Sequence, residues 1–118
     1  MSKRDPNVRL LHMRNYAHKA VAMVQGQARR DLDSDEKLRL ALTHLVELVG
    51  EAASQVPAGV RKQYPQVPWM KAIAMRHRLV HGYDQIDFDI LWRILSVELP
   101  GILEQLEAIL AENHKNES

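Results

Sequence analysis

The stretch FDILWRILSVELPGILEQLEAIL, from Phe88 to Leu110, decides the fold of this chain of 118 residues. Its apolar residues recur at three- and four-residue steps, which is the period of an α-helix. Before Pro100 they form two stripes on nearly opposite faces, the first with Phe88, Leu91, Leu95 and Leu99 and the second with Ile90, Ile94 and Val97. A helix that is apolar on two sides must be covered on two sides. We therefore expect this helix either to lie at the centre of its own bundle or to be covered by a second copy of the chain.

The rest of this segment is simpler. Beyond Pro100 a single apolar stripe remains, over residues 102–110. Proline lacks the backbone N–H of a regular helix, so Pro100 either kinks this helix or splits it. Residues 113–118 are polar and close the chain, and we expect them to form a disordered tail.

Three further segments have helical periodicity. Residues 6–27 predict a first helix, and residues 33–56 predict a second helix that begins at a capping box of Asp33 and Glu36. After a proline-rich connector, residues 69–81 predict a third helix. No segment alternates in the manner of a β-strand. The sequence therefore predicts one all-α domain over residues 1–118, an up-and-down bundle of four main helices.

Composition narrows the class of protein. The chain is 46% hydrophobic and 26% charged, which is typical of a globular domain, and its length excludes a two-domain enzyme. The chain has no Cys, which excludes disulfides, Fe–S clusters and thiol nucleophiles and fits a cytoplasmic protein. The longest apolar run is residues 20–24, too short for a membrane span. A domain of this size buries a modest core, so we expect an active site that is shallow or shared between subunits.

Charge is unevenly distributed along the chain, although the formal net charge is only +1. Residues 61–83 hold five Lys and Arg residues and no acidic residue, and residues 1–30 are also strongly basic. Such segments could form a local positive patch for phosphate groups. The alternative is that the basic segments face acidic ones across the bundle, since residues 31–60 and 84–118 are acidic.

Residues 76–83, RHRLVHGY, concentrate groups that could carry chemistry at the expected end of the third helix, where Gly82 is a candidate left-handed cap. Metal binding is one interpretation, because His77 and His81 share a helix face and Asp84 follows, but the neighbouring arginines would repel a dication. A purely structural interpretation is that these cations stabilise the negative end of the helix dipole. The third interpretation is cleavage of a phosphodiester.

Arginine and histidine suffice for metal-independent RNA cleavage. An imidazole can take the proton from a ribose 2′-OH or give one to a leaving 5′-oxygen near neutral pH. A guanidinium can stabilise the charge that builds on the phosphate. In a regular helix Arg76 and His81 would lie about 140° apart, so they converge only if the helix ends near Val80. A symmetric dimer would bring a second His81 to the same cleft.

The ordered set of motifs resembles the HEPN-domain toxins of the HepT type, which are small helical proteins of prokaryotic toxin–antitoxin pairs. Arg76, His81 and Tyr83 match the R-x-x-x-x-H-x-Y signature of that family. The resemblance runs from about residue 42 to residue 110 and includes GEAAS at 50–54, YPQVPW at 64–69, DILW at 89–92 and Leu-Pro at 99–100. An R-x-x-x-x-H match alone is weak, whereas the ordered set is specific.

The resemblance implies a homodimeric endoribonuclease with Arg76 and His81 as catalytic residues, acting without a metal or cofactor. The products would be a 2′,3′-cyclic phosphate and a 5′-hydroxyl, and the substrate would be tRNA or mRNA. It also implies a partner, a nucleotidyltransferase antitoxin of the MntA type, which neutralises such toxins by transferring AMP to the motif tyrosine, here Tyr83. Arg78, Lys71 and His77 are candidates for contacts with the RNA backbone.

One position departs from the family pattern, which most often has Asn directly after the motif arginine, where this chain has His77. Histidine can still donate a hydrogen bond or serve as a second acid or base. Glu51 lies in a family-like stretch and could pair with Arg76 or Arg78, or remain a solvated charge. Trp69 is expected to pack in the core or a dimer interface, as is Trp92. The alternative function is a non-catalytic partner of a nucleotidyltransferase that holds nucleotide.

Overall fold

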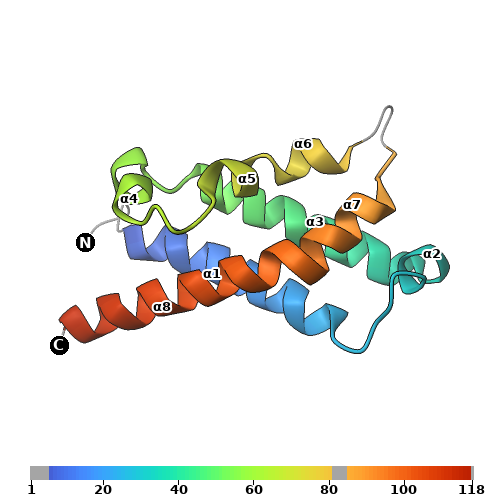
Figure 1. The fold of residues 1–118 in the computed structure, drawn as a ribbon, viewed down its shortest axis with the longest axis horizontal. Helices are drawn as coiled ribbons and strands as arrows, with labels where there is room; N and C mark the ends of the chain where they lie inside the picture. Colours follow the sequence, from blue (N-terminus) through green and yellow to red (C-terminus); the bar gives the residue numbers. More distant parts are fainter. Residues whose placement is uncertain (1–5, 81–84, 118) are drawn as a thin grey trace.

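Three long helices form the frame of the protein in a computed structural model, which describes residues 6–80 and 85–117. They are α1 (Pro6–Val24), α3 (Glu36–Ser54) and α8 (Leu99–Glu117), and α1 contacts both of the others (Figure 1). Within the described ranges the only β pairing is an isolated bridge between Val80 and Ile86. The predicted all-α class is confirmed.

The N-cap of the second predicted helix lies two residues later than expected. A short helix, α2 (Asp31–Ser34), occupies the predicted start, and the capping residue of α3 is Asp35, whose side chain accepts a hydrogen bond from the Leu38 amide. The prediction of Asp33 as the cap was therefore wrong. The Asp33 carboxylate instead forms an ion pair with Arg29 at 3.0 Å.

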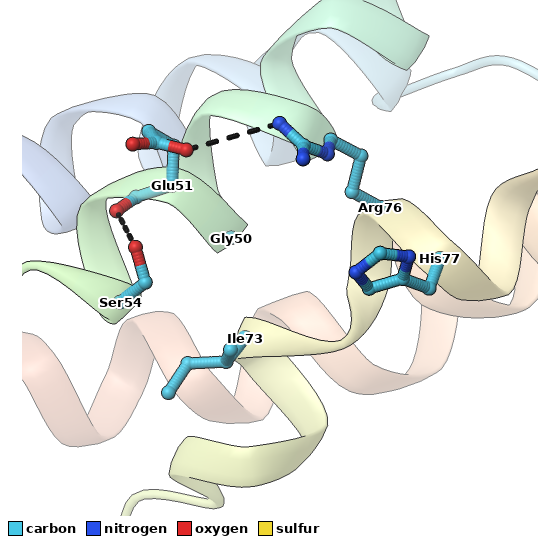
Figure 2. A pocket seen from close by; sticks show the side chains of 6 residues that line it. All are labelled: Gly50, Glu51, Ser54, Ile73, Arg76 and His77. Atoms are coloured by element: carbon cyan, nitrogen blue, oxygen red, sulfur yellow. Dashed lines mark hydrogen bonds and ion pairs between the residues drawn. The ribbon is translucent and has the colours of Figure 1, made fainter.

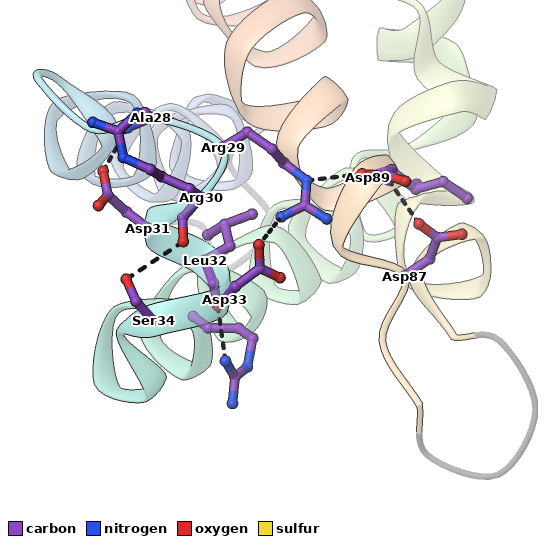
Figure 3. A network of polar contacts seen from close by, with 11 residues as sticks. Ala28, Arg29, Arg30, Asp31, Leu32, Asp33, Ser34, Asp87 and Asp89 are labelled. Atoms are coloured by element: carbon purple, nitrogen blue, oxygen red, sulfur yellow. Dashed lines mark hydrogen bonds and ion pairs between the residues drawn. The ribbon is translucent and has the colours of Figure 1, made fainter.

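The corner around α2 is joined to the start of the last helical segment (Figure 3). Arg29 pairs with Asp33 and, through Nε, with Asp89 at 2.8 Å. Arg29 and Arg39 also contact the ring face of Phe88, with guanidinium carbons 5.8 and 4.8 Å from the ring centroid. These exposed ion pairs contribute little individually, since solvent screens them. Together they hold the start of α7 beside α2, while the Asp87 side chain caps α7 by accepting a hydrogen bond from the Ile90 amide at 3.0 Å.

The third predicted helix is divided in two. It comprises α5 (Trp69–Ile73) and α6 (Met75–Leu79), separated by a turn at Ala74, and both contact α3. A further short helix, α4 (Ala58–Gln63), fills the connector. The expected end at residue 81 was too late, because α6 stops at Leu79 and Val80 is extended, with φ −81° and ψ 124°. Gly82, the predicted cap, lies outside the described residues.

The last helical segment continues through Pro100. It passes from α7 (Phe88–Arg93) into a π-helical turn, η1 (Ile94–Glu98), and then into α8, whose Leu99 amide donates to the carbonyl of Ile94. A π turn absorbs one extra residue, which accommodates the proline at the start of the following helix. The predicted alternatives of a kink or a split therefore resolve into a local change of helix type.

The two apolar stripes of this segment have different surroundings. The first stripe is buried at Leu91, Leu95 and Leu99, as predicted. In the second stripe Ile94 is fully buried within its own chain, whereas Val97 is 62% exposed. A second copy is therefore not needed to cover Ile94.

The end of α8 is helical where a disordered tail was expected. Helix α8 runs to Glu117, and Asn113 accepts a hydrogen bond from the Tyr64 hydroxyl at 3.1 Å and donates one to Asn7 at 2.8 Å. These contacts tie the helix to the connector and to α1. A polar end segment considered alone has no such partners, which is why the sequence predicted a disordered tail here.

Candidate functional site

Gly50 allows the turn before α6, the helix that carries Arg76 and His77, to come unusually close to α3. A Cβ atom built on Gly50 would lie 3.1 Å from the carbonyl oxygen of Ala72 and 3.5 Å from that of Ile73. Only a glycine leaves room for this approach without displacement of the neighbouring backbone. The close contact is at the turn between α5 and α6, so it places the residues that follow, Arg76 and His77, directly over α3.

A shallow hollow of about 140 Å³ opens between α3 and α6 at this contact (Figure 2). Its lining residues are Gly50, Glu51, Ser54, Ile73, Arg76 and His77. The Arg76 side chain is 56% exposed, and its NH1 lies 3.8 Å from Oε1 of Glu51, which is 52% exposed. The distance indicates an ion pair that leaves most guanidinium donors free for a bound anion.

Arg78 is held in a different direction from Arg76. Its two terminal nitrogens donate to the two carboxylate oxygens of Glu98 at 2.7 Å each, a bidentate pair that joins α6 to η1. Glu98 is only 9% exposed, so solvent screens this pair less than the others. The fork that would contact a phosphate is thus engaged by a carboxylate, which gives Arg78 a structural role at this position. Its candidacy for RNA contact stays a prediction.

The hydrogen bonds from Arg78 lower the pKa of the Glu98 carboxyl below its ordinary value of 4.5, and the charges of Arg78, Lys71 and Arg93 act in the same direction, against the effect of burial. A lowered folded-state pKa contributes stability above the ordinary pKa that is lost as the pH falls through the lowered value. We expect Glu98→Gln to reduce the free energy of unfolding at pH 7 by about 2 kcal/mol. The difference from wild type should shrink as the pH falls below 4.5.

Urea titrations from pH 7 to pH 3 on both proteins test this expectation. Glu104→Gln is the matched control, because Glu104 is an exposed carboxylate on α8. A Glu98→Gln deficit that stays constant across this pH range would show that the charge of Glu98 does not stabilise the fold.

The remaining site residues predicted from sequence are spread over two regions. His77 is exposed and lines the hollow beside Arg76. Lys71 is exposed but lines a separate groove between α5 and the start of α8, which also contains Glu98 and Val97. His81, Tyr83 and the candidate metal ligand Asp84 lie outside the described residues. The early end of α6 at Leu79 is nevertheless the break that convergence of Arg76 and His81 requires.

The described residues contain no group of three His, Asp or Glu side chains that could hold a metal ion.

The two tryptophans have packing roles, as predicted. Trp69 is buried and donates its indole N–H to the Tyr64 carbonyl at 2.9 Å, and Trp92 packs against the core. No helix in the described part of the chain is both long and apolar enough to cross a lipid bilayer.

Two polar residues near the hollow were missed by the sequence analysis. Gln55 on the turn after α3 donates to Glu51 at 3.2 Å, and Arg9 on α1 donates to Gln55 at 2.9 Å. The spacing of Glu51 and Gln55, four residues apart on one helix face, could have indicated the first contact. No local pattern indicates the second, because Arg9 and Gln55 are 46 residues apart.

Comparisons with known proteins find a matching family model and relatives that cover most of the chain. A family model described as "Ribonuclease HepT-like" matches residues 13–109. A "Putative RNase" of Methanocaldococcus jannaschii is 28% identical over 109 residues, which cover 92% of this chain and 100% of that protein. A "Putative RNase" of Caldanaerobacter subterraneus is 28% identical over 107 residues, or 91% of this chain and 96% of that protein.

A third relative, a "Probable ribonuclease HepT" of Thermococcus cleftensis, is 28% identical over 79 residues, which cover 67% of this chain and 72% of that protein. No solved structure matches the chain. The resemblance found in the sequence is therefore confirmed by a family model that covers most of the chain.

Proposed function

The chain belongs to the HepT-like family of ribonucleases, and we propose that it is the toxin of a type VII-like toxin–antitoxin pair, a metal-independent endoribonuclease of the cytoplasm. The observation that carries the proposal is the position of Arg76. It is exposed at the rim of a hollow, with most of its donors free, within the segment matched by the family model. The motif residue His81 follows five positions later.

The proposed reaction is a transfer of the phosphate to the adjacent 2′-oxygen. One His81 imidazole removes the 2′-OH proton as the 2′-oxygen bonds to phosphorus, and a second imidazole gives a proton to the departing 5′-oxygen as the P–O5′ bond breaks. Arg76 stabilises the charge on the pentacoordinate phosphate. The products are a 2′,3′-cyclic phosphate and a 5′-hydroxyl, and no metal or cofactor takes part in the proposed reaction.

The need for two imidazoles favours a homodimer. Each copy supplies one His81, so a cleft between two motif segments would hold both the base and the acid. Exposed apolar side chains on or after these elements would suit such pairing: Met70 on α5, Val80 after α6, and Val97 on η1. Val97 lines the same groove as Lys71 of α5. Burial of these side chains against a second copy would be favourable.

The proposed partner is a nucleotidyltransferase antitoxin of the MntA type that transfers AMP to Tyr83. An AMP group is bulky and anionic, and it would lie two residues from His81. Attached there, it would block access of RNA and compete with substrate for the charge of Arg76. The substrate is tRNA or mRNA, with His77, Lys71 and Arg78 as further proposed contacts with the RNA backbone.

Growth of cells that express the chain tests this function. We expect expression alone to stop growth, expression of His81→Ala to be tolerated, and coexpression with the antitoxin to restore growth. The Tyr83→Phe variant should stop growth even with the antitoxin, because it lacks the hydroxyl that accepts AMP. A wild-type chain that cells tolerate without the antitoxin would favour the alternative, a non-catalytic partner that holds nucleotide for a nucleotidyltransferase.

A further inference from the structure

Arg76 is the end of a continuous series of polar contacts that crosses three helices. Arg9 NH1 on α1 donates to Gln55 Oε1 at 2.9 Å, and Gln55 Nε2 donates to Glu51 Oε2 at 3.2 Å. The other carboxylate oxygen of Glu51 lies 3.8 Å from NH1 of Arg76 on α6. We infer that Gln55 and Arg9 are positioning residues, which act through Glu51 to orient the guanidinium of Arg76. This inference rests on the proposed role of Arg76 in RNA cleavage.

At every step of the series a donor faces an acceptor or a cation faces an anion. An amide has an acceptor end and a donor end, and Arg9 can only donate, so it selects the oxygen of Gln55. The Gln55 nitrogen then faces Glu51, whose carboxylate can only accept. Glu51 in turn presents its remaining oxygen to a cation. Arg9 therefore determines which end of the Gln55 amide meets Glu51.

The contacts of this series hold a side chain of a short helix against side chains of two long helices. Glu51 and Arg9 lie on helices of nineteen residues each, whereas Arg76 lies on a helix of five residues that follows a turn. Glu51 and Arg76 are both about half exposed, so neither is fixed by packing alone. Arg9, Glu51 and Gln55 also line a common hollow of about 120 Å³ between α1 and α3, which keeps the three side chains adjacent. Fixing a side chain before substrate binds lowers the entropy lost in the reaction.

Kinetics of RNA cleavage under metal-free conditions test the inference. We expect Gln55→Met and Arg9→Met each to lower kcat about tenfold with little change in KM, because these residues orient Arg76 and do not contact RNA. In a Glu51→Gln background, Gln55→Met should cause no further loss, since its effect passes through Glu51. The matched controls are Gln63→Met on α4 and Arg30→Met, which change exposed side chains that line neither hollow; both variants should cleave RNA as wild type does.

A second readout is independent of activity. The side-chain ¹H–¹⁵N resonances of Arg76 should change in Gln55→Met and in Glu51→Gln alike, and should be unchanged in Gln63→Met. The inference is overturned if the Arg76 resonances and the kcat of Gln55→Met both match wild type, or if the Gln55→Met loss persists in full without the Glu51 carboxylate. If wild type cleaves no RNA, the proposed function fails, and the resonances still decide whether the series orients Arg76.

Discussion

Replacing Arg76 by Ala is expected to lower the rate of RNA cleavage by about 10³-fold, as does the loss of one preorganised donor in other enzymes that stabilise a charged transition state. Arg76 is positioned at the rim of the hollow by the close approach of α6 to Gly50, and its exposed guanidinium is paired loosely with Glu51. No other arginine lines this hollow in the described part of the chain. No second guanidinium in that part of the chain can therefore take its place.

Single-turnover cleavage of a defined RNA by purified proteins measures this effect. Arg76→Lys should recover only a small part of the rate, because an ammonium lacks the planar fork that matches a phosphate. Arg30→Ala removes the same charge from an exposed side chain that does not line the hollow, and it serves as the control. Cleavage by a folded Arg76→Ala protein at a rate within threefold of wild type would exclude Arg76 from the reaction.

The second large effect concerns stability. Gly50→Val is expected to lower the free energy of unfolding by about 2 kcal/mol, since its branched side chain must displace the backbone of the turn at residues 72–74. The loss outweighs the gain of replacing a glycine inside a helix, which is at most about 1 kcal/mol. Displacement of this turn also moves Arg76, so cleavage should fall along with stability.

A matched glycine separates crowding from helix propensity. Gly101 lies in α8, and a Cβ atom built on it would meet nothing within 4 Å, so Gly101→Val should change stability by less than about 0.5 kcal/mol. Urea denaturation of both variants provides the comparison. Equal stability of Gly50→Val and Gly101→Val would mean that the approach of α6 to α3 is not as close as the distances at Gly50 indicate.

Much of the fold could be predicted from the period of the apolar residues. The long helices α1, α3 and α8 follow from it, because each must bury a stripe against the others. The turn inside the third helix and the form of the irregularity at Pro100 could not be predicted. The turn at Ala74 depends on contact with Gly50, which is distant in sequence, and the π turn before Pro100 depends on how the helix adjusts to a proline. Periodicity reports the buried face of a helix but carries no information on such tertiary contacts.

Only part of the candidate site could be predicted, because the tertiary contacts that complete it leave no local pattern in the sequence. Arg76 and His77 could be identified because their residue types and spacing carry chemistry within a single local motif. The partner of Arg78 could not be identified from sequence, because Glu98 lies 20 residues further along the chain and meets Arg78 only through the tertiary fold. Arg9 is a comparable case, since it meets Gln55 only when α1 lies beside α3.

Metal-independent cleavage of RNA by this chain is the activity on which the proposed roles of Arg76 and His81 depend. Its most direct test is incubation of total cellular RNA with the purified protein in EDTA, after mass spectrometry has shown that Tyr83 is unmodified, beside His81→Ala, with analysis of the fragment ends. We predict 2′,3′-cyclic phosphate and 5′-hydroxyl ends from wild type and no fragments from His81→Ala. Intact RNA after incubation with the unmodified wild type, or equal cleavage by His81→Ala, would contradict the account.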